Sequence, residues 1–296
     1  MAPARVLLTC LGFILVHVAA FAGEAPGYSI QFARKSFVGE RYAVTARGLE
    51  ENTTNTRRNA TIAPPQHKLR QVEFVATAEV LALTPLGLEA KSRYLVEKLV
   101  GTQDGKETSL LPAGSVLTAE RKRDKMEYLV NGKAVKGEVA NALSLCGLTL
   151  DADGVVRDDQ IFGSTERKQP GDIWPINGAA AAPVMKKMGL SVAPKDLTGD
   201  TRLVDIVKQN GQDVLRVGGR LILKNLDLPL PAGVIVQSSD IKATFSGVLP
   251  VDPDKRIIYS ALVAEAEIEC DGNVNGSYLA LQMNLRRAQS VSFEPR

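Results

Sequence analysis

Histidine, the side chain most often used for proton transfer and zinc binding, is almost absent from this chain. The 296 residues include two histidines, His17 and His67. His17 lies in an apolar N-terminal segment, and His67 follows Pro64 and Pro65 in a predicted loop, where a solvated side chain is the ordinary role. Sites built from several imidazoles are therefore excluded, and a catalytic triad would depend on His67 alone. We expect no catalytic residue, no metal site and no enzymatic activity.

The cysteines of the chain allow two alternatives, a disulfide or free thiols. Cys10 lies in the apolar N-terminal segment, so an exported chain would keep Cys146 and Cys270 as an even pair. A disulfide between them could persist outside the cytoplasm and would close a long loop. Alternatively, Cys146 lies among leucines, where a free cysteine serves as a small buried apolar group.

Three further patterns could carry chemistry, and each favours a simpler interpretation. The segment Asp151–Gly154 begins like a calcium loop but lacks the later ligands, so it predicts a turn. Asp158 and Asp159 would point to opposite faces of an extended segment, which favours a solvated loop. Gly218 and Gly219 lie inside a predicted strand with no lysine after them, so they indicate a bulge or a close backbone approach. We expect no cofactor.

Charge also excludes a class of partner. Lys and Arg number 36 against 33 Asp and Glu, a formal net charge of +3, which gives no basic surface typical of nucleic-acid binding. The densest basic run is Arg121–Arg123, between two predicted strands. It predicts a solvated hairpin tip, with contact to an anionic envelope surface as the alternative.

The N-terminus has the pattern of a secretion signal over residues 1–22. Arg5 precedes an apolar run, Val6–Val18, and small residues follow ahead of Gly23. The run is shorter than the roughly 20 residues that a membrane-spanning helix needs. We therefore expect cleavage before Gly23, no transmembrane segment after signal removal, and a secreted or periplasmic protein.

The dominant hydrophobic period of the remaining chain is two, which is typical of strands with one buried face. Alternate positions from Gln71 to Leu83 are apolar, and Asn131 and Gly132 are a strong hairpin signal. In the last predicted strand, alternate apolar residues from Leu279 to Leu285 share one face. Further strands are predicted over residues 88–100, 115–121, 125–130, 202–209, 213–224, 240–249, 256–270 and 277–293.

Helical spacing occurs only in the middle of the chain. It predicts one helix over Glu138–Leu148 and a shorter one over Ala179–Met188, which Pro183 permits only with a late start. The polar segment Glu50–Arg70 predicts a long, mobile loop. We expect an N-terminal antiparallel half (23–137), a helical and loop connector (138–199) and a C-terminal antiparallel half (200–296), with the two halves able to form one continuous domain.

Each half opens with a similar short pattern. Phe37–Tyr42 and Gln169–Trp174 both place an acidic residue directly after glycine and an aromatic residue three positions beyond that glycine. Both predict a turn that leads into a strand, with Tyr42 and Trp174 as structural anchors in the core. The fold class expected is mainly β with minor α: antiparallel meanders forming curved sheets or an open half-barrel covered by one or two helices.

Together the signal, the two opening patterns, the hairpin series and the central helix resemble uncharacterised bacterial exported proteins. The order of elements is also similar to that of periplasmic lipoprotein carriers of the LolA and LolB kind. That resemblance implies a curved antiparallel sheet wrapped around helices that shelters acyl chains. This chain departs from those carriers in its greater length, and no lipid-binding motif transfers residue by residue.

The leading functional hypothesis is a non-enzymatic envelope protein that binds an apolar ligand or lipid on a concave sheet face. The alternative is a structural or assembly module that binds another envelope protein through its sheet edges. A hydrolase that uses carboxylates alone is a third, weaker hypothesis.

Overall fold

The computed structural model describes residues 27–123, 125–187, 189–226, 228, 230 and 232–296. The expected signal segment and the expected start at Gly23 lie outside the described residues. Among the described residues, no helix is both long and apolar enough to cross a bilayer.

Strands dominate the structure, as the hydrophobic period predicts. The strands are β1 (Arg41–Arg58), β2 (Thr61–Ile62), β3 (Gln66–Leu83), β4 (Glu89–Gln103), β5 (Lys106–Leu111), β6 (Val116–Lys122), β7 (Lys125–Val130), β8 (Lys133–Ala134), β9 (Ile173–Pro175), β10 (Leu197–Gln209), β11 (Gln212–Leu223), β12 (Val234–Pro250), β13 (Tyr259–Val274) and β14 (Ser277–Pro295). The helices are α1 (Glu138–Leu145), α2 (Asp158–Phe162), α3 (Gly178–Lys187) and the 3₁₀ turn η1 (Pro194–Asp196).

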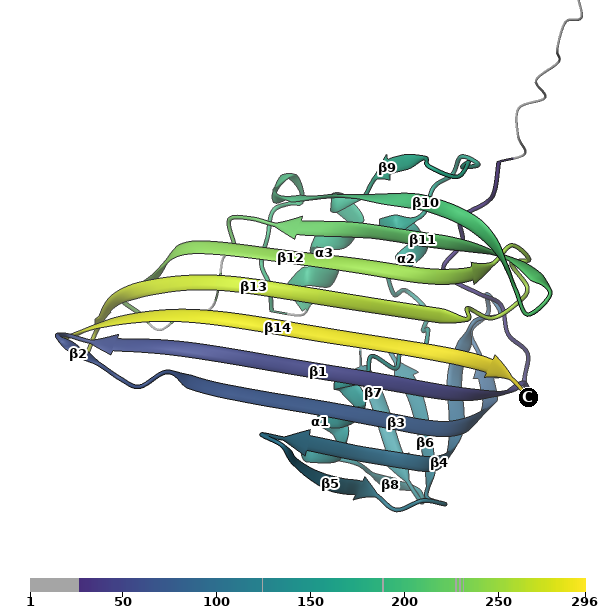
Figure 1. Cartoon of the computed structure of the whole chain (residues 1–296), viewed down its shortest axis with the longest axis horizontal. Coiled ribbons are helices and arrows are strands. Elements are labelled where there is room, and N and C mark those ends of the chain that lie inside the picture. The colour runs from purple at the N-terminus through teal and green to yellow at the C-terminus, as the bar shows by residue number, and fades with distance from the viewer. Residues whose placement is uncertain (1–26, 124, 188, 227, 229, 231) are drawn as a thin grey trace, which may run out of the picture.

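All the strands belong to one antiparallel sheet of 14 strands (Figure 1). Its order is β8-β7-β6-β4-β3-β1-β14-β13-β12-β11-β10-β9, with β2 on β1 and β5 on β4. The last strand returns to pair with the first, from Tyr42↔Pro295 to Arg58↔Leu279, which joins the two halves of the chain. The expectation of a mainly β, antiparallel fold is confirmed, and the sheet is not closed into a barrel.

The helices lie on one side of this sheet, behind it in the view of Figure 1. We call that side the inner face and the opposite side the outer face. Helix α1 packs with β1, β3, β4, β6 and β7 in one apolar cluster, and α2 and α3 pack with β10 to β13 in another. A third cluster surrounds Trp174, Leu203 and Leu215. The long strands β1, β12, β13 and β14 extend well beyond the helices (Figure 1).

The alternation of apolar and polar side chains along the strands explains the burial of residues on the inner face. In β3 the even positions from Val72 to Val80 are buried, while the residues between them are half-exposed. The hairpin between β7 and β8 turns at Asn131 and Gly132, which have positive φ angles of 50° and 76°, as the sequence signal predicts.

The structure of the polar segment 50–70 differs from the prediction. The sequence predicts a mobile loop here, but the segment forms the far end of β1, then β2, and the start of β3. Its side chains are mostly polar on both faces of the sheet. Its strand backbones are nevertheless paired, since residues 50–58 pair with β14 and residues 66–70 pair with β1.

The helices also differ from expectation in detail. Helix α1 ends at Leu145, before Gly147 with its positive φ of 71°. Helix α3 begins at Gly178 and contains Pro183, so the late start predicted from the proline is wrong. A proline there leaves only the carbonyl of Ala179 without its usual helical partner, one turn from the start of the helix.

Candidate functional site

A largely buried cluster of charged side chains lies at the end of the sheet where β1 begins. Arg256, in the loop between β12 and β13, donates to both carboxylate oxygens of Glu40, at 3.1 and 3.0 Å. It also donates to Glu89 Oε2 at 2.7 Å and to Ser36 Oγ at 3.2 Å. Its guanidinium lies 3.8 Å from the centre of the Tyr42 ring, and the Tyr42 hydroxyl donates to Glu89. These residues form the Arg256 cluster.

Electrostatics keep the cluster ionised. Burial alone would lower the pKa of Arg256, but the Glu89 and Glu40 carboxylates more than offset this and raise it. Burial alone would raise the pKa of Glu40, but hydrogen bonds from Arg256 and Ser36 bring it below its ordinary value. Burial also raises the pKa of Tyr42, so its hydroxyl remains a neutral donor.

The hydrogen-bond pattern of the cluster indicates a structural role. Arg256 directs four donor contacts to protein oxygens, and the guanidinium has five N–H groups in all. The residues come from the N-terminal segment, β1, β4 and the β12–β13 loop, so their contacts hold together segments that are distant in sequence. Most of the arginine donors are therefore engaged, and both carboxylates are held in ion pairs with Arg256.

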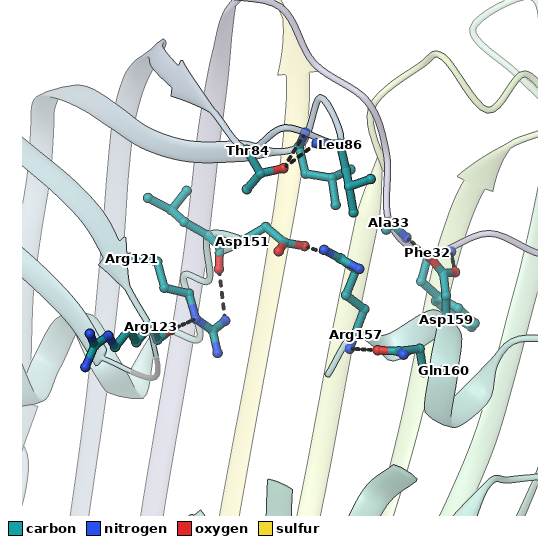
Figure 2. Close-up of polar contacts among 12 residues, drawn as sticks. Phe32, Ala33, Thr84, Leu86, Arg121, Arg123, Asp151, Arg157, Asp159 and Gln160 are labelled. Atoms are coloured by element: carbon teal, nitrogen blue, oxygen red, sulfur yellow. Dashed lines mark hydrogen bonds and ion pairs between the residues drawn. The ribbon is translucent and has the colours of Figure 1, made fainter. Parts of the chain in front are cut away.

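A second polar group fastens the segment that crosses the inner face between α1 and α3 (Figure 2). Arg157 Nε donates to Asp151 Oδ2 at 3.0 Å, and Arg121 Nη1 donates to the Leu150 carbonyl at 2.9 Å. Arg121 is half-buried, so the predicted solvated tip at residues 121–123 is wrong at its first residue. Its guanidinium turns back against the segment around Asp151 instead of pointing into solvent.

The prediction for the adjacent carboxylates Asp158 and Asp159 is also wrong. Asp158 and Asp159 are the first two residues of α2, and not part of a solvated loop. Asp159 accepts hydrogen bonds from the backbone N–H groups of Phe32 and Ala33, at 3.0 Å for Ala33 (Figure 2). A helix turns successive side chains by about 100°, so the two carboxylates point in different directions. Asp159 instead holds the N-terminal segment against α2.

The structure has no bridge between Cys146 and Cys270, which are both free and buried. Cys146 Sγ lies 4.0 Å from the Ala46 carbonyl oxygen, whereas Cys270 is in register with Leu281 and, through it, with Thr56. Ten residues of extended strand separate Ala46 from Thr56, a span of about 33 Å, far beyond disulfide geometry. Burial raises the pKa of Cys146 to about 12, as suits an apolar role.

The predicted anchors Tyr42 and Trp174 are both buried, with 2% and 6% of their surface exposed. Each lies just after a glycine turn, at Gly39 with φ of 88° and Gly171 with φ of 94°. His67 lies in β3, exposed, with its ring nitrogen 3.1 Å from a carboxylate oxygen of Glu51.

A different feature stands out on the inner face of β14. Leu279, Leu281, Met283 and Leu285 follow one another on the face that carries Val291, and we call them the β14 apolar row. Val291 is buried beneath the α1 cluster, but no member of the row is buried, and Leu285 is 39% exposed. The row lies on the part of the sheet that extends beyond the helices.

The residues on the two strands beside the row differ in polarity. On one side, β13 places the apolar residues Ala266, Ile268 and Cys270 opposite it, of which Ala266 and Cys270 are buried and Ile268 is half-buried. On the other side, β1 places Asn52 and Thr54 opposite it. This part of the inner face is thus apolar towards β13 and polar towards β1.

Sequence reasoning identified the alternation within the row but not its exposure. It missed the Arg256 cluster entirely, because Glu40, Glu89 and Arg256 are separated by 49 and 167 positions. Among the described residues, no group of three or more histidine, cysteine or acidic side chains is arranged to hold a metal ion.

Comparison with known proteins finds no matching family model and no matching curated protein. Among solved structures, one of lipovitellin concerned with lipid–protein interactions is 7% identical, with a TM-score of 0.39. The alignment covers 87% of this chain and 25% of that one, so this chain spans about a quarter of the lipovitellin chain.

An outer-membrane channel from Pseudomonas putida F1 is 10% identical, with a TM-score of 0.21, over 89% of this chain and 98% of the channel. The toluene transporter TodX of Pseudomonas putida is 8% identical, with a TM-score of 0.14, over 87% and 90%. Similarity at these TM-scores carries no conclusion about function, and the resemblance to LolA- and LolB-like carriers stays a prediction.

Proposed function

We propose that this chain is an exported, non-enzymatic envelope protein that binds an apolar ligand, such as a lipid, on the inner face of its sheet. The observation that carries the proposal is the β14 apolar row. Four large apolar side chains on the core-facing side of a strand remain unburied, although the same face of the same strand is buried at Val291. Covering them with an apolar ligand gains about 25 cal/mol for each Å² removed from water.

Three parts of the proposal rest on other grounds. Export to the periplasm or the exterior follows from the signal pattern of residues 1–22. The sheet is proposed to curve around α1, α2 and α3 as an open half-barrel, so that the row has a concave setting suited to a ligand. The absence of catalytic function is proposed from the sequence and from the structural role of the Arg256 cluster.

A neutral apolar probe tests the proposal. Nile red, titrated into the purified protein, should show saturable fluorescence enhancement, and the double variant Leu281→Gln, Met283→Gln should weaken its binding about tenfold or more. The matched control is Ile235→Gln, because Ile235 is 61% exposed on β12 and pairs with Asp271, one residue from the inner-facing Cys270. The proposal would be contradicted if the double variant and the Ile235→Gln control lost Nile red affinity equally, or if the unmodified protein showed no saturable binding.

The alternative of assembly through sheet edges receives less support. The strands at the two ends of the main sheet order, β8 and β9, are two and three residues long. Short edge strands limit pairing with another chain. Assembly through the edges therefore stays a secondary prediction.

A further inference from the structure

The inner face changes from apolar to basic where the β14 apolar row approaches α1. The next inner-facing residue after Leu285 is Arg287, whose Nη2 donates to the Ser144 carbonyl of α1 at 2.9 Å. Glu50 on β1 pairs in register with Arg287 and, on its other side, with Arg70 on β3. The three side chains form a cross-strand row that runs Arg70, Glu50, Arg287.

The two arginines are held in place but are not neutralised. Arg70 Nη2 donates to the Glu138 carbonyl at the start of α1, at 3.2 Å. Among the described residues, no carboxylate oxygen lies within 4.0 Å of a nitrogen of Arg70 or Arg287. Each guanidinium has five N–H donors, so both keep donors for a further partner. Lys68, inner-facing and exposed on β3, adds a third cation beside Glu50. Arg70 also lines a surface hollow together with Lys106, Asp104 and Glu138.

The dimensions of the row suit a hydrocarbon chain. Leu279 to Leu285 spans six residues of strand, about 20 Å at 3.3 Å per residue. An acyl chain fills half of a bilayer core that is about 30 Å thick, or about 15 Å. A chain laid along the row from Leu285 would therefore be accommodated within its length, with its head group beside Arg287.

We infer that the ligand of the inner face is an anionic amphiphile, with its hydrocarbon chain along the β14 apolar row and its carboxylate or phosphate head group at Arg287 and Arg70. This inference rests on the proposed function and adds a ligand class to it. Arginine is suited to such head groups because its planar fork donates two parallel hydrogen bonds to carboxylate or phosphate oxygens.

Two amphiphiles with the same chain test the head-group assignment. Palmitoyl lysophosphatidic acid is anionic and monopalmitoylglycerol is neutral, and each is titrated in competition with Nile red. The protein should bind the anionic amphiphile about tenfold more tightly, since hydrogen bonds to charged groups are the stronger ones. Arg287→Gln should remove that preference while retaining affinity for monopalmitoylglycerol. Palmitate, as a third probe, separates carboxylate from phosphate recognition.

The chain offers a matched control in the adjacent residue. Arg286 points to the outer face, where its Nε lies 3.6 Å from Glu265, so Arg286→Gln removes the same charge without touching the proposed site. Arg58 lies opposite Leu279 at the far end of the row, so Arg58→Gln tests the orientation of the chain. Both variants should retain the preference for the anionic amphiphile.

The outcomes separate the inference from the proposed function. If both amphiphiles bind with equal affinity, the head-group assignment is overturned and the apolar site stands. If neither binds, both are overturned. If Arg286→Gln loses as much preference as Arg287→Gln, the effect is one of overall charge, and the site at Arg287 is rejected. If Arg58→Gln loses it instead, the head group lies at the opposite end.

Discussion

At the scale of single residues, Arg256 shows how one side chain can connect distant parts of the sheet. It joins Glu40 before β1 and Glu89 on β4 to the β12–β13 loop, and it lies over the ring of Tyr42. Removing one partner of a buried ion pair leaves an uncompensated charge, which costs about 3–5 kcal/mol. The aromatic anchor that the sequence identified is thus part of an ionic cluster as well as of the core.

The depressed pKa of Glu40 predicts a specific acid sensitivity. Because the folded-state pKa is lower than its usual 4.5, the ionised Glu40 stabilises the fold at higher pH, and this contribution is lost as the pH falls below 4.5 through the folded-state value. The free energy of unfolding, measured by urea titration at pH 6, 4.5 and 3.5, should fall less with acidification in Glu40→Gln than in the unmodified protein. Glu107→Gln, at an exposed position on β5, is the control and should leave the pH slope unchanged. Identical slopes for Glu40→Gln and the unmodified protein would refute the role of Glu40.

At the scale of elements, β11 shows how a strand accommodates a neighbour. Gly219 lies inside the strand, and a Cβ there would meet the Phe245 ring of β12 and lie 2.5 Å from the Asp200 carbonyl oxygen of β10. The Phe245 ring in turn contacts Phe162 of α2, with centroids 4.5 Å apart. The close backbone approach predicted from Gly218 and Gly219 is confirmed at Gly219, where it lets an aromatic cluster link the sheet to α2.

We expect alanine to change the free energy of unfolding differently at the two glycines. Gly219→Ala should lower the free energy of unfolding by about 1–3 kcal/mol, because overpacking against a backbone carbonyl has no easy relief. Gly218→Ala should have a smaller effect, since its nearest neighbour would be the Phe245 carbonyl oxygen at 3.4 Å. Urea unfolding of both variants measures the difference, and equal losses would show that strand propensity, not the close approach, decides the effect.

At the scale of the whole molecule, the pairing of β14 with β1 makes one sheet from two halves. The connection runs along almost the full length of both strands, so neither half has a free edge at this position. The three apolar clusters are therefore attached to a common sheet.

This continuity predicts cooperative unfolding. Trp174 is the only tryptophan and lies in the cluster of β9, β10 and β11, so its fluorescence reports on the second half of the chain. Far-ultraviolet circular dichroism reports on strands of both halves. We expect the two signals to change at the same urea concentration, as in a single cooperative transition. A fluorescence transition well separated from the dichroism transition would show that the halves unfold independently.

Local alternation made much of the fold predictable. The buried positions of β3, the turn at Asn131 and Gly132, and the alternating face from Leu279 to Leu285 follow from a period of two and from residues that accept positive φ. These features depend on neighbours in the sequence, so the sequence alone determined them. It also excluded a site built from several imidazoles of this chain, because composition does not depend on the fold.

Only the tertiary structure decided which faces are covered and which charges meet. The segment 50–70 lacks the alternation of buried apolar residues that predicts a strand, and backbone pairing with β14, β1 and β3 leaves no signal in the side chains. The contact between Arg256 and Glu40 also joins segments that are distant in sequence. The position of Arg287 between the unburied apolar row and Glu50 likewise depends on the pairing of β14 with β1. The sequence specified what each strand presents on its two faces, and the order of strands in space determined what those faces contact.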